Sequence, residues 1–269
     1  MDSDAVPILE TPVSGVRPST RFTTPPLMTE NLAAVSRMSN YCRWIFDMVS
    51  PHLGTDLLEA GCGNGNLTRW LLSAPAVQRL VGVDHAPALC DQLRERLKAD
   101  PKNWTVLNFD LQDERLLELS SEPFDAIVCL NVLEHIDRDV ELLKRFHRLL
   151  KPGGRLILLV PAFPWLYGSI DREVHHLRRY RRKDLAKKII ASGLSVHEMR
   201  YFNLGGIPAW IWHGKILQLK IHREGDMRFW DHLVPWLQRF EKAIPVPAGL
   251  SIFAVAVKAS GGLSLGGSA

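Results

Sequence analysis

The sequence lacks the features that mark several classes of protein. Only 4 of its 269 residues are cysteines, and they form no Cys-x-x-Cys pair and no zinc-finger spacing with histidine. A disulfide framework and a structural zinc site are therefore not indicated. The longest apolar stretch, near residues 207–219, is shorter than the roughly 20 residues that span a bilayer, and polar residues and proline interrupt it. The formal net charge of +4 implies no strong field for polyanions, and the start of the chain shows no leader pattern. We expect a cytoplasmic chain without stable membrane insertion.

The two ends of the chain differ in composition from its middle. Residues 1–28 are rich in proline, serine and threonine, which predicts an extended or disordered arm. Residues 261–269 are rich in glycine and serine, which predicts a flexible tail. Residues 29–260 are long enough for one α/β domain with insertions. Within it, apolar residues at three- and four-residue steps predict a first helix over about 30–49.

A glycine-rich stretch, Asp56–Thr68, organises the middle of the chain. Two leucines read as the end of a buried strand, and Gly61, Gly63 and Gly65 follow before apolar residues recur at helical spacing. Glycines allow positive φ angles and close approach of a ligand, and the helix start behind them favours an anionic group. The dinucleotide fingerprint Gly-x-Gly-x-x-Gly is not matched, because Asn66 stands at its third glycine. An ordinary tight turn between strand and helix is the structural alternative.

Further apolar strands follow and alternate with helical patterns. One ends at Asp84, the next at Asp110, a third covers about 124–131, and a fourth follows the glycines near position 153. This alternation predicts a parallel sheet whose carboxyl ends, with the glycine turn and both acids, meet at one edge. An acid at the tip of the second strand is placed to accept ribose hydroxyls.

The segments "LLEAGCGNGNLT", "VGVDHA", "FDAIVCLNVLEHI" and "LLKPGGRLILLVPA" occur in this order over about residues 56–162. Together they resemble the class I S-adenosylmethionine-dependent methyltransferase family, in its bacterial small-molecule type 11/12 subset. The resemblance implies an α/β, Rossmann-like, doubly wound and mostly parallel seven-stranded sheet with an antiparallel last strand. It also implies an N-terminal helix and a helical cap insertion. The implied cofactor is S-adenosylmethionine, with S-adenosylhomocysteine as product and no metal.

The same resemblance assigns a set of cofactor contacts. The glycines would cradle the methionine moiety, Glu59 would fix its ammonium group and Asp84 would hold the ribose. The full predicted cofactor set is Tyr41, Arg43, Glu59, Gly61, Gly63, Gly65, Asp84, His85, Asp110, Leu111 and Asn131. Plain packing or surface roles are the alternatives for Tyr41, Arg43 and His85.

Two segments are expected to form the acceptor side, at about 163–182 and 203–245. The stretch "PAFPWLYGSIDREVHHLRRYRRKDL" is similar to one in the same subset, except that His175 stands where glycine is usual. The candidates for acceptor contact or proton removal are His135, Tyr167 and His176. The candidates for substrate binding are Trp165, Asp171, His175, Arg179, Tyr180 and Trp210. The Arg178–Arg179 and Arg181–Arg182 pairs are either a solvated basic face or a clamp for an acidic acceptor.

These features predict transfer of a methyl group to a small molecule by in-line displacement. O-methylation of a carboxylate or phenolic metabolite is the leading hypothesis, and N- or C-methylation of a small or lipid-like molecule is the alternative. An RNA methyltransferase, a nicotinamide oxidoreductase and a non-catalytic cofactor-binding module are further alternatives. The predicted partner is a small-molecule acceptor, without nucleic acid, and a homodimer is compatible with the sequence.

Overall fold

The computed structural model describes residues 38–212, 224–244 and 246–260, and gives only the helix path for 224–229. The predicted arm and tail, and the predicted helix before residue 38, lie outside the described residues. The last part of that helix is present as α2.

Seven strands form one sheet in the order β3-β2-β1-β4-β5-β7-β6. The strands are β1 (Asp56–Ala60), β2 (Arg79–Asp84), β3 (Asn103–Asn108), β4 (Phe124–Leu130), β5 (Leu150–Pro161), β6 (Ser195–Phe202) and β7 (Ser251–Val257). The ladders from β3 to β5 are parallel, whereas β7 pairs antiparallel with both β5 and β6. The predicted doubly wound sheet with an antiparallel last strand is confirmed.

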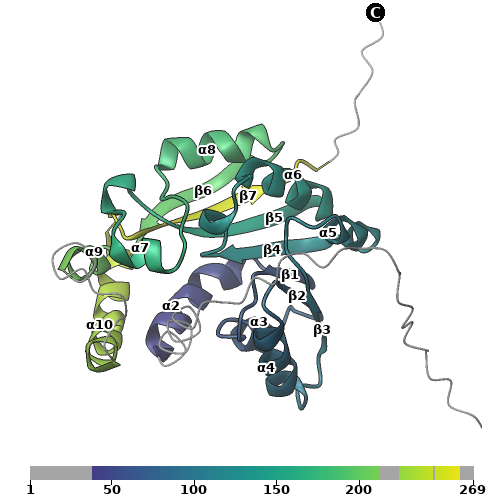
Figure 1. Cartoon of the computed structure of the whole chain (residues 1–269), viewed down its shortest axis with the longest axis horizontal. Coiled ribbons are helices and arrows are strands. Elements are labelled where there is room, and N and C mark those ends of the chain that lie inside the picture. Colours follow the sequence, from purple (N-terminus) through teal and green to yellow (C-terminus); the bar gives the residue numbers. More distant parts are fainter. Residues whose placement is uncertain (1–37, 213–223, 245, 261–269) are drawn as a thin grey trace, which may run out of the picture.

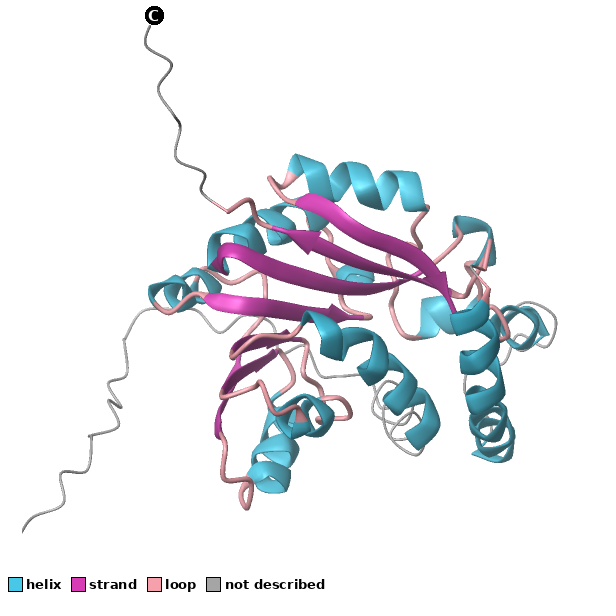
Figure 2. Cartoon of the chain, turned by 180° about the vertical axis from the view of Figure 1, so that it is seen from behind, coloured by secondary structure: helices cyan, strands magenta, loops and turns pink. Residues whose placement is uncertain are grey.

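Helices cover both faces of this sheet. The α-helices are α2 (Ser39–Val49), α3 (Thr68–Ser73), α4 (Pro87–Leu97), α5 (Arg115–Glu118), α6 (Asp139–Leu149), α7 (Ser169–Glu173), α8 (Arg182–Ala191), α9 (Gly206–Trp210) and α10 (Glu224–Ala243). Short 3₁₀ turns are η1 (Ser50–His52), η2 (Leu119–Ser121), η3 (Leu133–His135) and η4 (Pro164–Leu166). Figure 1 shows α5, α6 and α8 on one side of the sheet and α2, α3 and α4 on the other; Figure 2 shows the same layers from behind.

The core has two halves because central strands are apolar on both faces. In β5, Leu156 and Leu158 pack with α6 and α8, while Ile157 and Leu159 pack with α2, α3 and α4. Such runs are typical of parallel strands that helices cover on both sides. All four cysteines are buried and none forms a disulfide, as expected from their spacing.

The helix α10 is fastened by two buried carboxylates. Asp231 accepts hydrogen bonds from the backbone amides of Asn40 and Tyr41, at 3.3 and 3.0 Å, and so satisfies the free N–H groups that begin α2. Glu241 accepts from the amides of Asn203 and Leu204, at 3.0 and 2.7 Å, where the chain leaves β6. No helix in the described part of the chain is long and apolar enough to cross a membrane.

The carboxyl ends of β1, β2, β4 and β5 lie at one edge of the sheet. The chain order reverses between β1 and β4, so the crevice outside these two strands is the topological switch point of the fold. Ligands of open α/β sheets bind at this point. The glycine turn follows β1 here, and η3 follows β4.

Candidate functional site

The turn after β1 has the backbone that its glycines predict. Gly61, Gly63 and Gly65 have φ angles of +79°, +53° and +86°. A side chain at Gly61 would run into Val132, and one at Gly65 would run into Leu93. Since both positions combine positive φ with close neighbours, the turn requires glycine and leaves its amides open to a ligand.

Asp84, at the tip of β2, holds the glycine turn in place. Its Oδ2 accepts from the amide of Gly63 at 2.8 Å, and its Oδ1 accepts from the amide of Ala86 at 2.9 Å. The residue is 7% exposed. A carboxylate offers about four acceptor positions, so two remain for the hydroxyl groups of a ribose.

Glu59, near the end of β1, is a buried acid without a cation beside it. Its Oε2 accepts from the hydroxyl of Thr68 at 2.6 Å. Burial raises the pKa of Glu59 to about 8, against the lowering effect of that hydrogen bond. In the same turn Asn64 has a buried side-chain oxygen without a hydrogen-bond partner among the described residues. A ligand ammonium group would satisfy these acceptors, so the residues present fit S-adenosylmethionine.

The structure brings only part of the predicted cofactor set to this turn. His85 is exposed beside Asp84, with its Nδ1 3.6 Å from Oδ1. In the turn after β3, Asp110 is exposed and Leu111 is buried. Asn131, directly after β4, takes a φ of +53°.

The two predicted contacts on α2 lie in different surroundings. The ring of Tyr41 lies 5.9 Å from that of Phe202, and burial raises its pKa. Arg43 is exposed. In the described part of the chain, no hydrogen bond or ion pair joins either residue to the glycine turn.

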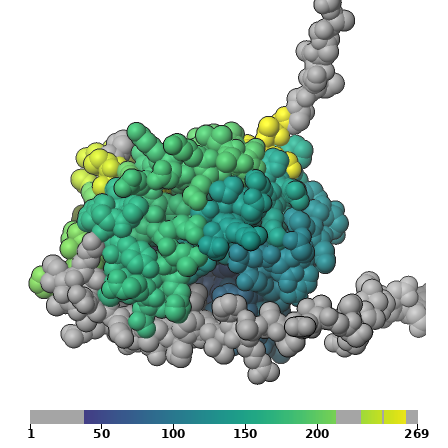
Figure 3. All heavy atoms as spheres, turned by 45° about the horizontal axis from the view of Figure 1, so that its top comes forward, coloured from purple at the N-terminus to yellow at the C-terminus, as the bar shows by residue number. Residues whose placement is uncertain are grey.

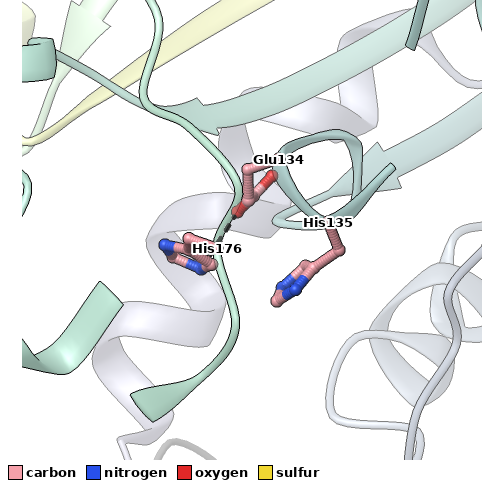
Figure 4. Close-up of side chains that lie close together, drawn as sticks. All are labelled: Glu134, His135 and His176. Atoms are coloured by element: carbon pink, nitrogen blue, oxygen red, sulfur yellow. Dashed lines mark ion pairs between the residues drawn. The ribbon is translucent and has the colours of Figure 1, made fainter. Parts of the chain in front are cut away.

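A second group of ionisable side chains lies at the end of β4. Glu134 and His135 belong to η3, and His176 comes from the loop after α7 (Figure 4). One ligand atom of each lies within 4.8 Å of the other two. The rings of His135 and His176 meet edge to face with centroids 4.8 Å apart. Two of the three predicted proton-transfer candidates are thus neighbours.

Protonation of this group follows from its burial. Glu134 is fully buried, which raises its pKa to about 7, and neither of its side-chain oxygens has a hydrogen-bond partner among the described residues. Burial, followed by the nearby His176, lowers the pKa of His135 to about 4. At neutral pH His135 is therefore uncharged, and it is a weaker base than an ordinary histidine.

Asp171 in α7 is the centre of a buried hydrogen-bond network. Its Oδ1 lies 2.8 Å from Nδ1 of His176 and accepts from Nε of Arg179 at 2.8 Å, while Oδ2 accepts from the amide of Gly168 at 2.8 Å. Hydrogen bonds and the Arg179 charge lower the pKa of Asp171, against burial. The Arg179 guanidinium lies 4.4 Å from the ring centre of Trp210. Asp171, Arg179 and Trp210 therefore orient His176.

The two central arginines of the basic segment are paired inside the protein. Arg179 is 5% exposed and bound to Asp171, and Arg178 donates to Asp139 at 2.9 Å. The hydroxyl of Tyr180 lies 3.0 Å from Asp139, in the core beneath α6 and α8. These contacts match neither a solvated basic face nor a clamp that is free for a ligand.

The remaining acceptor-side candidates lie in the segment after β5. Tyr167 donates from its hydroxyl to the backbone oxygen of His176 at 2.8 Å, and Trp165 is exposed. His175 has a φ of +59°, which explains why glycine is usual at this position. Together with Asn131 and Phe163, it is one of the non-glycine residues with positive φ near this edge of the sheet. Such conformations concentrate at ligand sites.

Figure 3 shows a hollow in one face of the molecule, between teal and green segments, with atoms in the colour of α2 at its floor. A separate depression of about 260 Å³ is lined by residues of the turn after β3 and of α6. Leu111 is the one predicted site residue in that lining, so we place the site at the glycine turn and η3 on geometric grounds.

Several functional candidates were missed by sequence reasoning. Glu134 lies in the segment "FDAIVCLNVLEHI", but it is not among the site residues predicted from the sequence. Like Asp84, it stands close to the end of a strand. The sequence pattern also does not indicate the roles of Thr68, which donates a hydrogen bond to Glu59, and of Asp139, which accepts one from Arg178. Both are simply polar residues close to apolar ones in the sequence. Their roles arise from contacts between elements distant in sequence.

Comparisons with known proteins agree with this architecture. Residues 58–156 match the family profile described as a methyltransferase domain. An O-methyltransferase family protein from Burkholderia thailandensis superposes with a TM-score of 0.58 at 16% identity, over 87% of this chain and 60% of that chain. The fold is thus that of a Rossmann-like methyltransferase. The central part of the chain, residues 58–156, is therefore a methyltransferase domain.

Two curated relatives match the central part of the chain. A ubiquinone biosynthesis O-methyltransferase of Coxiella burnetii is 32% identical over 103 residues, 38% of this chain and 42% of that protein. A tRNA U34 carboxymethyltransferase of Idiomarina loihiensis is 31% identical over 121 residues, 43% of this chain and 36% of that protein. The chain spans about two fifths of the length of these relatives.

Proposed function

We propose that this protein transfers the methyl group of S-adenosylmethionine to a hydroxyl group of a small-molecule acceptor. The observation that carries the proposal is the pairing, at one switch point, of the glycine turn held by Asp84 with the ionisable group on η3. The turn and Glu59 provide acceptors and open amides for the amino-acid end of the cofactor. His135 and Glu134 lie where the next strand ends, beside the place where an acceptor would sit.

The bound cofactor would supply an electrophilic methyl group on a sulfonium. The protein's task is to align the acceptor oxygen with it and to exclude water, and such positioning alone gives large accelerations. His135, uncharged at pH 7, would accept a hydrogen bond from the acceptor hydroxyl at a ring nitrogen and so orient its oxygen. Because its pKa of about 4 makes it a weak base, the proton would pass to solvent as the bond to the methyl carbon forms. Asp171 and Tyr167 would keep His176 and its loop in place for this step.

The contacts of two arginines favour a hydroxyl acceptor over a carboxylate. A carboxylate is best held by a cation without another ion-pair partner, and Arg178 and Arg179 are already bound to Asp139 and Asp171, which leaves only the exposed Arg181 and Arg182 of this segment. The relative named as a ubiquinone biosynthesis O-methyltransferase supports transfer to oxygen.

Calorimetric titration with S-adenosylmethionine and S-adenosylhomocysteine tests the cofactor half of the proposal. We expect micromolar-class binding by the wild type and loss of most of it in Asp84→Ala. Asp91→Ala is the matched control, because it removes an exposed carboxylate that pairs with Arg94, in the next turn of α4. Absence of binding by the folded wild type would refute the proposal, provided that addition of candidate acceptors does not restore it.

Screening phenolic and carboxylic acceptors with a labelled methyl donor tests the second half. Turnover of hydroxyl compounds alone agrees with the proposal, whereas methyl-ester formation would contradict it. Tight cofactor binding without any turnover would favour a non-catalytic module.

A nucleic-acid acceptor is the second candidate, because one relative carries the name of a tRNA-modifying enzyme. Retention on RNA that weakens steeply with salt, together with label transfer to tRNA, would support it.

A further inference from the structure

The group on η3 has the composition of a metal site. Glu134, His135 and His176 offer one carboxylate oxygen and two imidazole nitrogens, all within 4.8 Å of one another (Figure 4). Oε1 of Glu134 and Nε2 of His176 are 3.6 Å apart. Two ligands bound tetrahedrally at about 2.1 Å from an ion lie roughly 3.4 Å apart, so this pair is near the required separation.

The hydrogen bonds in the described part of the chain do not account for the Glu134 carboxylate. It is fully buried, and both oxygens lack a hydrogen-bond partner among the described residues. A buried carboxylate without partners is costly and normally pairs with a cation, coordinates a metal or takes up a proton. The nearest positive candidate, His176, is 3.6 Å away at Oε1 and leaves Oε2 unbound.

His176 is oriented from behind by a carboxylate, as histidines that bind metals usually are. Nδ1 of His176 lies 2.8 Å from Asp171, whose carboxylate is in turn bound to Arg179, and so Nε2 is left toward Glu134. The backbone of His175 lies beside the ring of His135 and raises its pKa, against the larger effect of burial. A carboxylate or carbonyl behind the imidazole fixes the tautomer that presents a lone pair to a metal.

The geometry points to a divalent transition-metal site formed by Glu134, His135 and His176, with zinc or iron(II) as the ions that suit two imidazoles and one carboxylate. Three protein ligands leave at least one coordination position open. A plain ion relay of Asp171, His176 and Glu134 is the competing arrangement, and in it His135 would keep only the contact with the acceptor proposed above.

The site lies on the acceptor side, and its function rests on the proposed function. An acceptor hydroxyl in the open position would lose its proton to solvent or to a site base at lower pH than in water. Its oxygen lone pair then forms the bond to the methyl carbon, and the electron pair of the broken carbon–sulfur bond stays on sulfur. A hydroxyl or catechol-like acceptor would be selected over a purely carboxylic one.

Titration of the chelator-treated full-length protein with Co²⁺, followed by visible absorption and calorimetry, tests the site. We expect one ion per chain and a ligand-field band, with affinity reduced at least about 100-fold in Glu134→Gln and His176→Asn. His175→Asn is the matched control, because it removes a neighbouring exposed imidazole and asparagine tolerates the left-handed backbone. Competition by Zn²⁺ should remove the band.

Binding of no ion by the folded wild type, or equal affinity in the ligand variants, would overturn the inference. Circular dichroism identifies a ligand variant that fails to fold. In that case His135→Asn is used instead, because the side chain of His135 is partly exposed and its replacement disturbs the core less. S-adenosylhomocysteine binding is measured on the same samples. If the protein binds S-adenosylhomocysteine but no metal ion, the metal site is refuted and the proposed function stands. If it binds the metal ion but no S-adenosylhomocysteine, the metal site stands and the proposed function is refuted.

Discussion

Glu59 gives the sharpest test of where the cofactor's ammonium group lies. Its carboxyl is buried, bound only to Thr68 among the hydrogen bonds found, and has a pKa of about 8. At pH 7 it is therefore about nine-tenths protonated. An ammonium group placed against it favours the ionised form, so that binding must expel the proton.

The expected magnitude is most of one proton released for each ligand bound. An α-amino group with an ordinary pKa near 7.8 takes up roughly 0.1 proton at pH 7, so the net release is about 0.8. Calorimetry of S-adenosylhomocysteine binding in buffers of different ionisation enthalpy measures this number directly. Glu59→Gln should release none and bind roughly 10- to 100-fold more weakly, the range for a lost hydrogen bond to a charged group.

Thr68→Val is the matched control for this experiment. It removes the hydrogen bond that lowers the pKa of Glu59, so proton release should move closer to one while the carboxylate remains. Equal proton release and equal affinity in the wild type and Glu59→Gln would refute the placement of the ammonium group on Glu59.

For stability, the expected effect of replacing Glu59 is opposite to its expected effect on ligand binding. Because its folded pKa is raised above the ordinary 4.5, the folded state binds more protons than the unfolded state between about pH 4.5 and 8. The free energy of unfolding then falls as pH rises through this window, by at most about 1.4 kcal/mol per pH unit. Glu59→Gln should therefore melt at a higher temperature than the wild type at pH 8, and this advantage should vanish below pH 4.5.

Three further predictions follow from other parts of the site. His175→Gly should raise the free energy of unfolding by up to about 1 kcal/mol, because φ is +59° at this position. His175→Val should lower the free energy of unfolding, and denaturant titration of both variants and the wild type measures the two changes. Asp171→Asn should destabilise by about 3–5 kcal/mol, because it leaves the charge of Arg179 buried without its partner; an unchanged denaturation midpoint would contradict the network. Gly61→Ala should abolish cofactor binding at unchanged secondary structure, since the new methyl group meets Val132 at positive φ, and calorimetry with circular dichroism separates the two effects.

The fold was predictable because its signals are local. Each core strand is a short apolar run, each turn at the carboxyl edge carries glycine or an acid, and the order of motifs fixes the sheet. Pairing of α10 with α2 was not predictable in this way. It depends on Asp231 meeting two amides some 190 positions earlier in the chain, and no periodicity in either segment encodes that contact.

The conformation of the glycine turn was more predictable than the contacts of the segment after β5, for a related reason. Gly61, Gly63 and Asp84 act through backbone geometry and strand ends, which the sequence pattern specifies. Arg178 and Arg179 act through side-chain partners that lie on other elements. The same local sequence is compatible with arginines that bind a ligand and with arginines that are paired inside the protein.

The acceptor side also shows why Glu134 was overlooked. In the sequence, Glu134 follows two apolar residues after a strand, and this pattern predicts only a polar residue in a turn next to a buried segment. Its significance appears only when His176, 41 positions after His135, is brought back over β4 by the loop that Asp171 fastens. That loop passes through His175 in a conformation that a non-glycine residue rarely adopts. A chain that keeps a strained backbone, a buried ion pair and an unpartnered carboxylate together at one strand end indicates selection for a site there, since packing alone would be better served by apolar side chains.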